Sequence, residues 1–456
     1  MKPQFLIGGA TMCSGKTIFA MGLLRALKKR GIKVQPYKCG PDFLDPQLHC
    51  ISSGTDSVNL DLWLSGRTHL QYIYNKYGDK SDVCVIEGNA GLYDGYRRMQ
   101  GSSAEMSNLL SVPVILVVNA RMSAYSVAPL LYGFKHFRPV ARIAGVVFTH
   151  VSSAVHFSHL KDACSDAGLS CLGYIPYDES LKLPAKHSSL TQTARLEIEE
   201  VIEKASSYVC QNIDIDKILK SCTRIFPCEY TLPYTSDVEE FSAVRFLGQH
   251  KKMRIAIARD AAFNFIYKEN LDKLSALGNI LFFSPLYGKD MPELNPQMDI
   301  LYLPGGYPEL FARQLHRRKS FMEQLKQFAD SGGRIIAEGG GMSLLCNSLT
   351  VRDGGTAYKM SGVFPFDCSM SESRHVSGYR MAERSSCILK GYETRYIKLS
   401  SDTSSTEPGR EEISATTVSN TKGTDAMTPV FRYKNVIAGF THWYWGEIEI
   451  MSLWNS

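Results

Sequence analysis

The chain has 456 residues, about three times the length of an average domain, so we expect two or three domains. Hydrophobic residues make up 44% of the sequence and charged residues 21%, a composition that excludes a chain disordered along its whole length. The net charge of +6 is spread along the sequence without a basic stripe, so we expect no nucleic-acid partner. No apolar run approaches the ~18 residues of a membrane-spanning helix, and the first residues lack a signal-peptide pattern, so we expect a cytoplasmic protein with no membrane partner.

The cysteines point to no disulfide scaffold and no zinc site. There are twelve of them, and they form no CxxC pair and no Cys/His cluster with the spacing of zinc ligands. Small secreted domains held by disulfides are much richer in cysteine than this chain. We therefore expect free thiols in a reducing compartment.

The first two hundred residues alternate short apolar strands with amphipathic helices. A helix is expected at 16–31, where apolar residues recur at helical spacing and Gly31 ends the pattern. The expected strands are QFLIGGA, IKVQPYK, DVCVIEG, VPVILVVNA, IAGVVFTHV and CLGYIP. Strands rich in Val and Ile on both faces and joined by helices predict a parallel sheet covered on both sides.

The alternation of strands and helices stops at about 205–250. This stretch is rich in proline, serine and charged residues, and we interpret it as an inter-domain linker. A second α/β pattern starts at Met253, with strands RIAIAR, ILFFSPL, ILYLPGG and RIIAEGG. The polar stretch that begins at Ser400 predicts a surface excursion. We expect two different α/β domains, at 1–204 and 251–456.

The segment GATMCSGKT, residues 9–17, lies between an expected strand and an expected helix. In that context backbone N–H groups and a helix N-terminus can cradle phosphates, so the segment predicts a phosphate-binding loop. Lys16 would reach the terminal phosphates of a nucleotide, and the Thr17 hydroxyl would bind Mg²⁺. The alternative is a glycine turn in an ordinary βα unit. The expected nucleotide-binding residues are Gly9, Thr11, Ser14, Gly15, Lys16 and Thr17.

Acidic residues follow the second and third long strands. Asp42 ends KCGPD, while Glu87 and Asp94 lie in EGNAGLYDG. Ligands of open α/β sheets bind at the carboxyl ends of the strands, where a carboxylate can hold Mg²⁺ or position a reacting group. The alternative for each is a solvated loop acid, but the glycines beside Glu87 and Asp94 favour a ligand site.

Several motifs together resemble one family, the cobyrinic acid a,c-diamide synthases. They are GATMCSGKT, KCGPDFLDPQLH, NLDLW, VIEGNAGLYDG, GSSAEMSNLL, LPAKH, ARDAAFNFIY, FFSPL, YLPGGYPE and AGFTHWYW. The resemblance implies an α/β P-loop domain with a parallel sheet, similar to dethiobiotin synthetase, joined to a class I glutamine-amidotransferase-like α/β domain. It also implies ATP-dependent amidation of the a and c acetate groups of a cobyrinic acid-type tetrapyrrole through an acyl phosphate.

The resemblance also implies roles for single residues. Thr17 and Glu87 match Mg²⁺ ligands, and Asp42 is a weaker candidate for the same metal. The residues expected on the substrate side are Phe43, Leu44 and Asp94, of which Asp94 is also expected to be catalytic. Two positions depart from the family pattern: Cys13 replaces a central loop glycine, and Thr149 replaces an asparagine associated with base recognition.

The second domain has the elbow of a class I amidotransferase without its nucleophile. Where the family reads Ala-Glu-Cys-Gly-Gly, this chain has Gly339 in place of the cysteine. The expected oxyanion residues, Gly305 and Gly306, and the expected catalytic histidine, His442, are present. Because glycine cannot form a thioester, we predict negligible glutaminase activity and a supply of ammonia from solution or from an external glutaminase.

Neighbouring residues have plainer interpretations. Cys346 is expected seven residues into the next helix, about 10 Å along its axis, too far to replace the nucleophile. Without a nucleophile, the favoured alternative for His442 is a partly exposed histidine with no catalytic role. Glu338 is expected as an acid near a helix start, and the two tryptophans beside Tyr444 as packing residues.

Three functions remain open at this point. The favoured one is an ATP-dependent amidoligase that uses Mg²⁺ and ammonia. The second is a catalytically dead, nucleotide-dependent tetrapyrrole-binding protein. The third is diamidation of sirohydrochlorin or nickel-sirohydrochlorin. The sequence leaves the oligomeric state open, a homodimer included.

Overall fold

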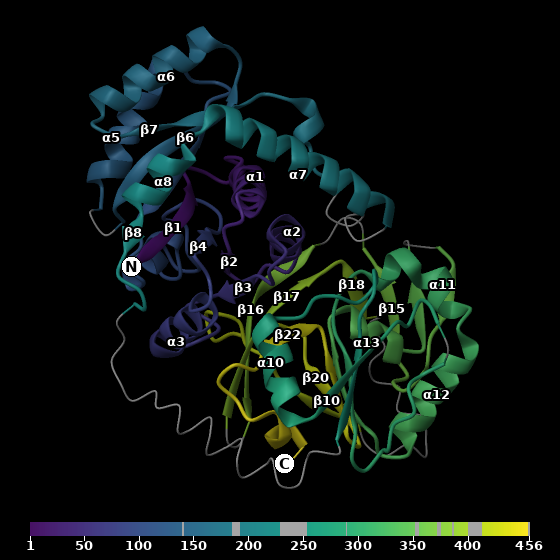
Figure 1. The fold of residues 1–456 in the computed structure, drawn as a ribbon. Helices are drawn as coiled ribbons and strands as arrows, with labels where there is room; N and C mark the ends of the chain where they lie inside the picture. Colours follow the sequence, from purple (N-terminus) through teal and green to yellow (C-terminus); the bar gives the residue numbers. More distant parts are fainter. Residues whose placement is uncertain are drawn as a thin grey trace. The chain divides into compact units, whose positions relative to one another are not determined.

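The chain folds into two compact units, Met1–Tyr234 and Thr235–Ser456, shown in Figure 1. The computed structural model describes residues 1–138, 141–184, 192–228, 253–288, 290–351, 355–371, 375–384, 387–399 and 413–454. Within these ranges, no helix is both long enough and apolar enough to cross a membrane.

The first unit is built on a parallel sheet with the strand order β3-β2-β4-β1-β5-β6-β7. The strands are β1 Lys2–Gly9, β2 Val34–Cys39, β3 Val58–Leu60, β4 Val83–Glu87, β5 Val114–Asn119, β6 Ile143–Val151 and β7 Cys171–Pro176. A short strand, β8 (Thr223–Arg224), pairs antiparallel with β1. The predicted parallel sheet is confirmed, and its one unpredicted parallel strand is the three-residue β3.

Helices cover both faces of this sheet, because its strands bury side chains on both sides. The helices are α1 Lys16–Lys29, α2 Leu44–Ser53, α3 Arg67–Gly78, α4 Ser103–Leu109, α5 Ala128–His136, α6 Ala154–Asp166, α7 Gln192–Asn212 and α8 Ile215–Ser221. Along β1, Phe5 and Ile7 pack in a core with α1, α7 and α8. Leu6 points to the opposite core, which contains residues of α3 to α6.

The expected linker at 205–250 needs a correction in its first part. Helix α7 runs through the expected boundary at residue 204, and α8 and β8 follow it. Ala205, Val209 and Ile218 are fully buried in the core of the first unit. The polar sequence hides this, because α7 buries only a narrow apolar stripe. Residues 229–252 lie outside the described ranges.

The second unit has a seven-stranded sheet in the order β10-β9-β11-β12-β21-β20-β19. These strands are β9 Arg254–Ala258, β10 Asn279–Phe283, β11 Ile300–Leu303, β12 Arg334–Glu338, β19 Ser414–Thr416, β20 Val430–Tyr433 and β21 Val436–Gly439. The first five in the order are parallel to one another, β20 pairs antiparallel with β21, and β19 pairs antiparallel with β20. The expected surface excursion falls partly outside the described residues, at 400–412.

Two layers cover the sheet of the second unit. One core holds residues of α11 (Ala312–His316), α12 (Lys319–Asp330) and α13 (Gly340–Leu345). The other holds residues of α10 (Lys268–Leu277) and of a three-stranded antiparallel sheet. The smaller sheets contain β13 Ser348–Thr350, β14 Ala357–Lys359, β15 Asp367–Met370 and β18 Ile397–Leu399, and β16 Val376–Arg384, β17 Cys387–Arg395 and β22 Thr441–Tyr444.

Candidate nucleotide and amidotransferase sites

The predicted phosphate loop joins β1 to α1 at the carboxyl edge of the parallel sheet. Helix α1 begins directly after Gly15, whose φ of 88° is in the left-handed region. Cys13 also has a positive φ, 59°, so the residue that replaces a loop glycine adopts a glycine-like backbone conformation. A Cβ on Gly9 would lie 2.5 Å from Ser14 Oγ and 2.8 Å from Lys16 Nζ, so the loop closes tightly over this position.

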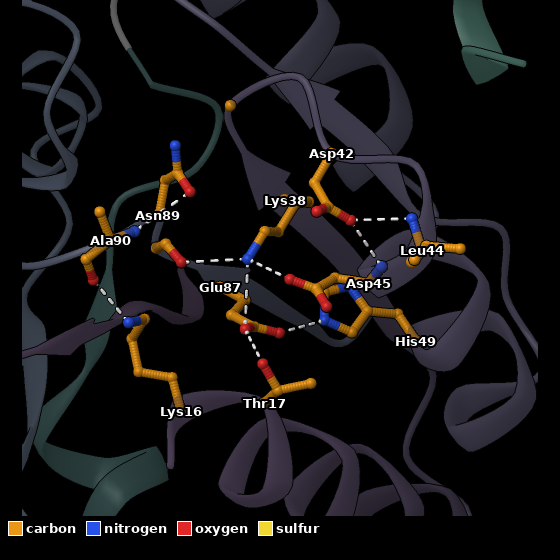
Figure 2. A network of polar contacts seen from close by, with 12 residues as sticks. Lys16, Thr17, Lys38, Asp42, Leu44, Asp45, His49, Glu87, Asn89 and Ala90 are labelled. Atoms are coloured by element: carbon orange, nitrogen blue, oxygen red, sulfur yellow. Dashed lines mark hydrogen bonds and ion pairs between the residues drawn. The ribbon is translucent and has the colours of Figure 1, made fainter. Parts of the chain in front are cut away.

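The side chains of the loop suit a phosphate. Lys16 is buried and its Nζ donates a hydrogen bond to the Ala90 carbonyl at 2.5 Å (Figure 2). Ser14 Oγ is buried without a hydrogen-bond partner among the described residues. Thr11 is exposed. Burial and the nearby Lys38 ammonium lower the pKa of Lys16.

Thr149, near the end of β6, contacts the predicted phosphate loop. Its Oγ1 donates to the Ser14 carbonyl at 2.7 Å, and it is 3% exposed. A Cβ on Gly15 would lie only 2.9 Å from its methyl group. The residue expected to bear on base recognition therefore contacts the phosphate loop itself.

Glu87 lies at the centre of a buried polar network (Figure 2). Its Oε1 accepts from Thr17 Oγ1 at 2.7 Å and from Lys38 Nζ at 3.2 Å, and its Oε2 lies 2.6 Å from His49 Nε2. Lys38 is also paired with Asp45 at 2.6 Å. The strand order places the carboxyl ends of β2, β4 and β1 side by side, which brings these residues together.

The charges in this network fix its ionisation state. Burial alone would raise the pKa of Glu87, but the Lys38 ammonium and the His49 hydrogen bond lower it below its usual range. Burial alone would lower the pKa of Lys38, but Asp45 and Glu87 raise it above its usual range. Glu87 is therefore an anion and Lys38 a cation in the folded protein.

The other expected residues of this domain lie around the network. Asp42 does not join it by a hydrogen bond: its Oδ1 accepts from the backbone N–H groups of Leu44 and Asp45, both at 2.8 Å, and so caps α2. Phe43 is buried and Leu44 half-buried. Asp94 is exposed, and its Oδ2 accepts from the Gly91 N–H at 2.9 Å.

Sequence reasoning did not single out Lys38, Asp45 or His49. All three lie in KCGPDFLDPQLH, and Asp45 and His49 are four residues apart, one helical turn on the same face of α2. This i, i+4 spacing is the sequence feature that could have indicated that Asp45 and His49 lie together. The partner of His49, in contrast, comes from a strand 38 residues away and needs the sheet order.

In the second unit, Gly339 forms the sharp turn between β12 and α13, with φ 52° and ψ −118°. Its N–H donates to the Gly439 carbonyl at 2.9 Å. A Cβ built on Gly339 would lie 2.6 Å from His442 Nε2, and one on Gly305 would lie 2.6 Å from His442 Nδ1. The imidazole therefore lies between the elbow and the expected oxyanion loop.

The expected oxyanion loop has a constrained backbone. The Gly305 carbonyl accepts from the N–H groups of Asn264 and Phe265, at 2.9 and 3.0 Å. Gly306 has a φ of 156°, and a Cβ there would meet the backbone of Ala262 and Phe263. Gly306 is therefore needed for the close approach of the backbone at Ala262 and Phe263, and Gly305 for the close approach of the His442 ring.

His442 is 1% exposed, so the expected partial exposure of this histidine is wrong. The Phe265 ring packs edge-on against the imidazole, with the two ring centroids 5.8 Å apart. Burial lowers the pKa of His442 to about 3. Trp443 and Trp445 are buried packing residues, as expected, and the Tyr444 hydroxyl bonds to Glu269.

Glu338 and Cys346 differ from expectation. Glu338 is fully buried, its carboxyl accepting from the Tyr302 hydroxyl at 2.8 Å and the Trp443 N–H at 3.2 Å, and burial raises its pKa to about 8. It ties β12 to β22 rather than serving as a solvated helix-start acid. Cys346 lies just beyond α13, which ends at Leu345, and its Sγ is buried 3.2 Å from that of Cys368.

Comparisons with known proteins agree with this two-unit architecture. Residues 13–190 match the CobQ/CobB/MinD/ParA nucleotide binding domain, and residues 254–449 match the CobB/CobQ-like glutamine amidotransferase domain. The cobyrinate a,c-diamide synthase of Caldanaerobacter subterraneus is 32% identical, over 96% of this chain and 94% of its own length. This chain belongs to the cobyrinate a,c-diamide synthase family.

Other members of the family match at similar levels. The synthase of Listeria monocytogenes is 34% identical, over 87% of this chain and 85% of the relative. That of Picrophilus torridus is 31% identical, over 97% of this chain and 95% of the relative. The family resemblance inferred from the sequence motifs is thus confirmed across both units.

Proposed function

We propose that this chain is an ATP-dependent ligase that converts the a and c acetate carboxylates of cobyrinic acid to amides. The observation that carries the proposal is the buried Lys16 beside the Thr17–Glu87 pair, at the carboxyl edge of a parallel sheet. Membership of the cobyrinate a,c-diamide synthase family supports the substrate class.

The residues at this edge fit Mg²⁺. Thr17 Oγ1 and the ionised Glu87 provide two hard oxygen donors 2.7 Å apart. Within the described residues no group of three or more His, Cys, Asp or Glu side chains could hold a metal. Two oxygen donors suit Mg²⁺, which binds proteins through one or two oxygen ligands and takes the rest from water and phosphate. When bound, Mg²⁺ would neutralise phosphate charge.

The protein groups then support a two-step reaction. A substrate carboxylate attacks the γ-phosphorus, a new P–O bond forms and the bond to ADP breaks, which gives an acyl phosphate. Ammonia next attacks the acyl carbon, the C–O bond to phosphate breaks and the nitrogen loses a proton. Lys16 would exchange its bond to the Ala90 carbonyl for the phosphate oxygens and stabilise their charge. Phe43, Leu44 and Asp94 are proposed to face the substrate.

The same proposal includes ammonia rather than glutamine as the nitrogen source. Gly339 has no thiol at the elbow, and His442 fills the adjoining space. Loss of a covalent nucleophile commonly lowers turnover by about 10⁶. Cys346 cannot take its place, because its thiol is fully buried and donates to the Met342 carbonyl.

The test uses the purified full chain with Mg²⁺, ATP, ammonium and cobyrinic acid. Mass spectrometry should show the a,c-diamide, and ADP release should depend on the tetrapyrrole. Parallel reactions contain sirohydrochlorin or nickel-sirohydrochlorin instead. Tetrapyrrole binding without amide formation at any ammonium concentration would contradict the proposal and favour a catalytically dead binding protein. A preference for sirohydrochlorin would reassign the substrate.

A further inference from the structure

A buried chain of three side chains runs behind the proposed metal site. Ser57 Oγ lies 3.0 Å from His49 Nδ1, and His49 Nε2 lies 2.6 Å from Glu87 Oε2. The exposed fractions are 6% for Ser57, 1% for His49 and 1% for Glu87. Solvent therefore has little access to any of these hydrogen bonds.

Each buried polar atom of this chain has a partner. Glu87 Oε1 accepts from Thr17 and Lys38, and the His49 Nε2 N–H donates to Oε2. The Ser57 hydroxyl holds the other ring nitrogen, Nδ1, and so fixes the plane of the imidazole.

The chain acts on the orientation of Glu87. His49 holds Oε2, so Oε1 is turned to Thr17, at 2.7 Å. Lys38 Nζ lies 3.2 Å from the same oxygen and attracts the carboxylate as well. Without the donor on His49, nothing in the described network holds Oε2, and the carboxylate is free to rotate toward Lys38.

We propose that His49 is a positioning residue that holds Glu87 in the orientation needed to share a divalent cation with Thr17. The proposal rests on the proposed function, because that function places Mg²⁺ between the two residues. His49 does not contact the cation or the substrate in this scheme. Its contribution is the fixed rotamer of Glu87, since hydrogen bonds to a ligand's far atom commonly change metal affinity.

The experiment measures the affinity for a fluorescent ADP with Mg²⁺ and with EDTA, using the full chain. The quantity of interest is the ratio of the two affinities, the Mg²⁺ enhancement. His49→Leu should lower this enhancement about 10–100-fold and leave the affinity in EDTA unchanged. His49→Gln, which keeps a donor near the position of Nε2, should restore most of it.

Two further variants keep the test decisive. Ser57→Ala removes only the partner of Nδ1, so it should fold and lower the enhancement by less than His49→Leu. His69→Leu is the matched control, because His69 is equally buried, 1% exposed, on helix α3. It should change stability without changing the enhancement. Electron paramagnetic resonance of Mn²⁺ gives a second readout. The affinity of the ADP complex for Mn²⁺ should fall in the same variants that lose the Mg²⁺ enhancement.

An unchanged Mg²⁺ enhancement in folded His49→Leu, or in Ser57→Ala if His49→Leu does not fold, would overturn the proposal. So would an equal loss of affinity in EDTA, which would indicate a general disruption of the loop. No tetrapyrrole or ammonia is present in these measurements. Failure of the amidation assay with a normal result here would therefore concern the proposed function alone.

Discussion

The imidazole of His442 lies in the space that a side chain on Gly339 would occupy. A Cβ on that glycine would fall 2.6 Å from Nε2, well inside van der Waals contact. In a class I amidotransferase the same two positions carry the general base and the nucleophile. Because Gly339 has no side chain, the imidazole of His442 can lie directly against the elbow.

Gly339→Ala should therefore destabilise the protein by about 2–4 kcal/mol, because the added methyl group meets the imidazole and the backbone is strained. Urea unfolding measures this. Gly423→Ala is the matched control in the same unit: it also has a positive φ, 76°, but no atom within 4 Å of the new Cβ. Its expected cost is only about 1 kcal/mol. Addition of His442→Ala should relieve part of the loss at Gly339, and strict additivity of the two substitutions would argue against the contact.

Gly339→Cys tests whether the nucleophile is the only missing part. A Cβ at this position meets the His442 ring in both Gly339→Cys and Gly339→Ala, so the two variants should lose similar stability and differ in the thiol. We expect glutamate release from glutamine in Gly339→Cys and none in Gly339→Ala. A folded Gly339→Cys variant with no glutamate release would show that the oxyanion loop has also lost its function.

Cys13 should be protected by nucleotide. It is exposed and lies in the phosphate loop, whereas Cys210, which is also exposed, lies on α7. Brief treatment with N-ethylmaleimide followed by peptide mass spectrometry should show both modified. Mg²⁺ and ATP should lower modification of Cys13 and leave Cys210 unchanged. Equal modification with and without ATP would place the nucleotide elsewhere.

Glu338 should make the protein less stable as pH rises. Burial raises its folded-state pKa to about 8, against an ordinary value of 4.5. The contribution is fully present below pH 4.5 and is lost as pH rises through about 8. In Glu338→Gln the side chain stays neutral, as the protonated acid beside Tyr302 is. The wild type should lose unfolding free energy on the order of a few kcal/mol between pH 4.5 and 8, and Glu338→Gln should not show this loss.

The measurement is the free energy of unfolding in urea across that pH range. A smaller slope should remain in Glu338→Gln, because burial also raises the pKa of Glu309 to about 7. Glu309→Gln is therefore the second arm, and it should remove the part of the slope that comes from Glu309. An identical slope in wild type and Glu338→Gln would mean that Glu338 is ionised in the folded state.

The parallel sheets were predictable because their strands are continuous apolar runs, such as VILVV in β5, buried on both faces. The small sheets of the second unit were not. Strands such as β14 and β15 are only three or four residues long, too short to show a clear alternation of apolar and polar residues. The predicted domain boundary at residue 204 falls inside helix α7, because the sequence of this helix is mostly polar.

In the candidate sites too, some features were predictable from the sequence and others were not. Local motifs identified the phosphate loop and the elbow, since their residues are adjacent in sequence. The partners of Glu87, by contrast, come from α1, α2 and β2, and only the strand order joins them. Thr149 was linked to base recognition, but its contact with Ser14 depends on the neighbouring positions of β6 and the loop.

An isotope competition reports directly whether ammonium or glutamine supplies the amide nitrogen. Cobyrinic acid, ATP and Mg²⁺ are incubated with the full chain, unlabelled ammonium and glutamine labelled with ¹⁵N at the amide. Mass spectrometry of the a,c-diamide then reports the nitrogen source. We predict a diamide that contains only unlabelled nitrogen, and no diamide when ammonium is omitted. A ¹⁵N-labelled diamide would contradict the use of ammonia, since it would show that the chain takes nitrogen from glutamine despite Gly339.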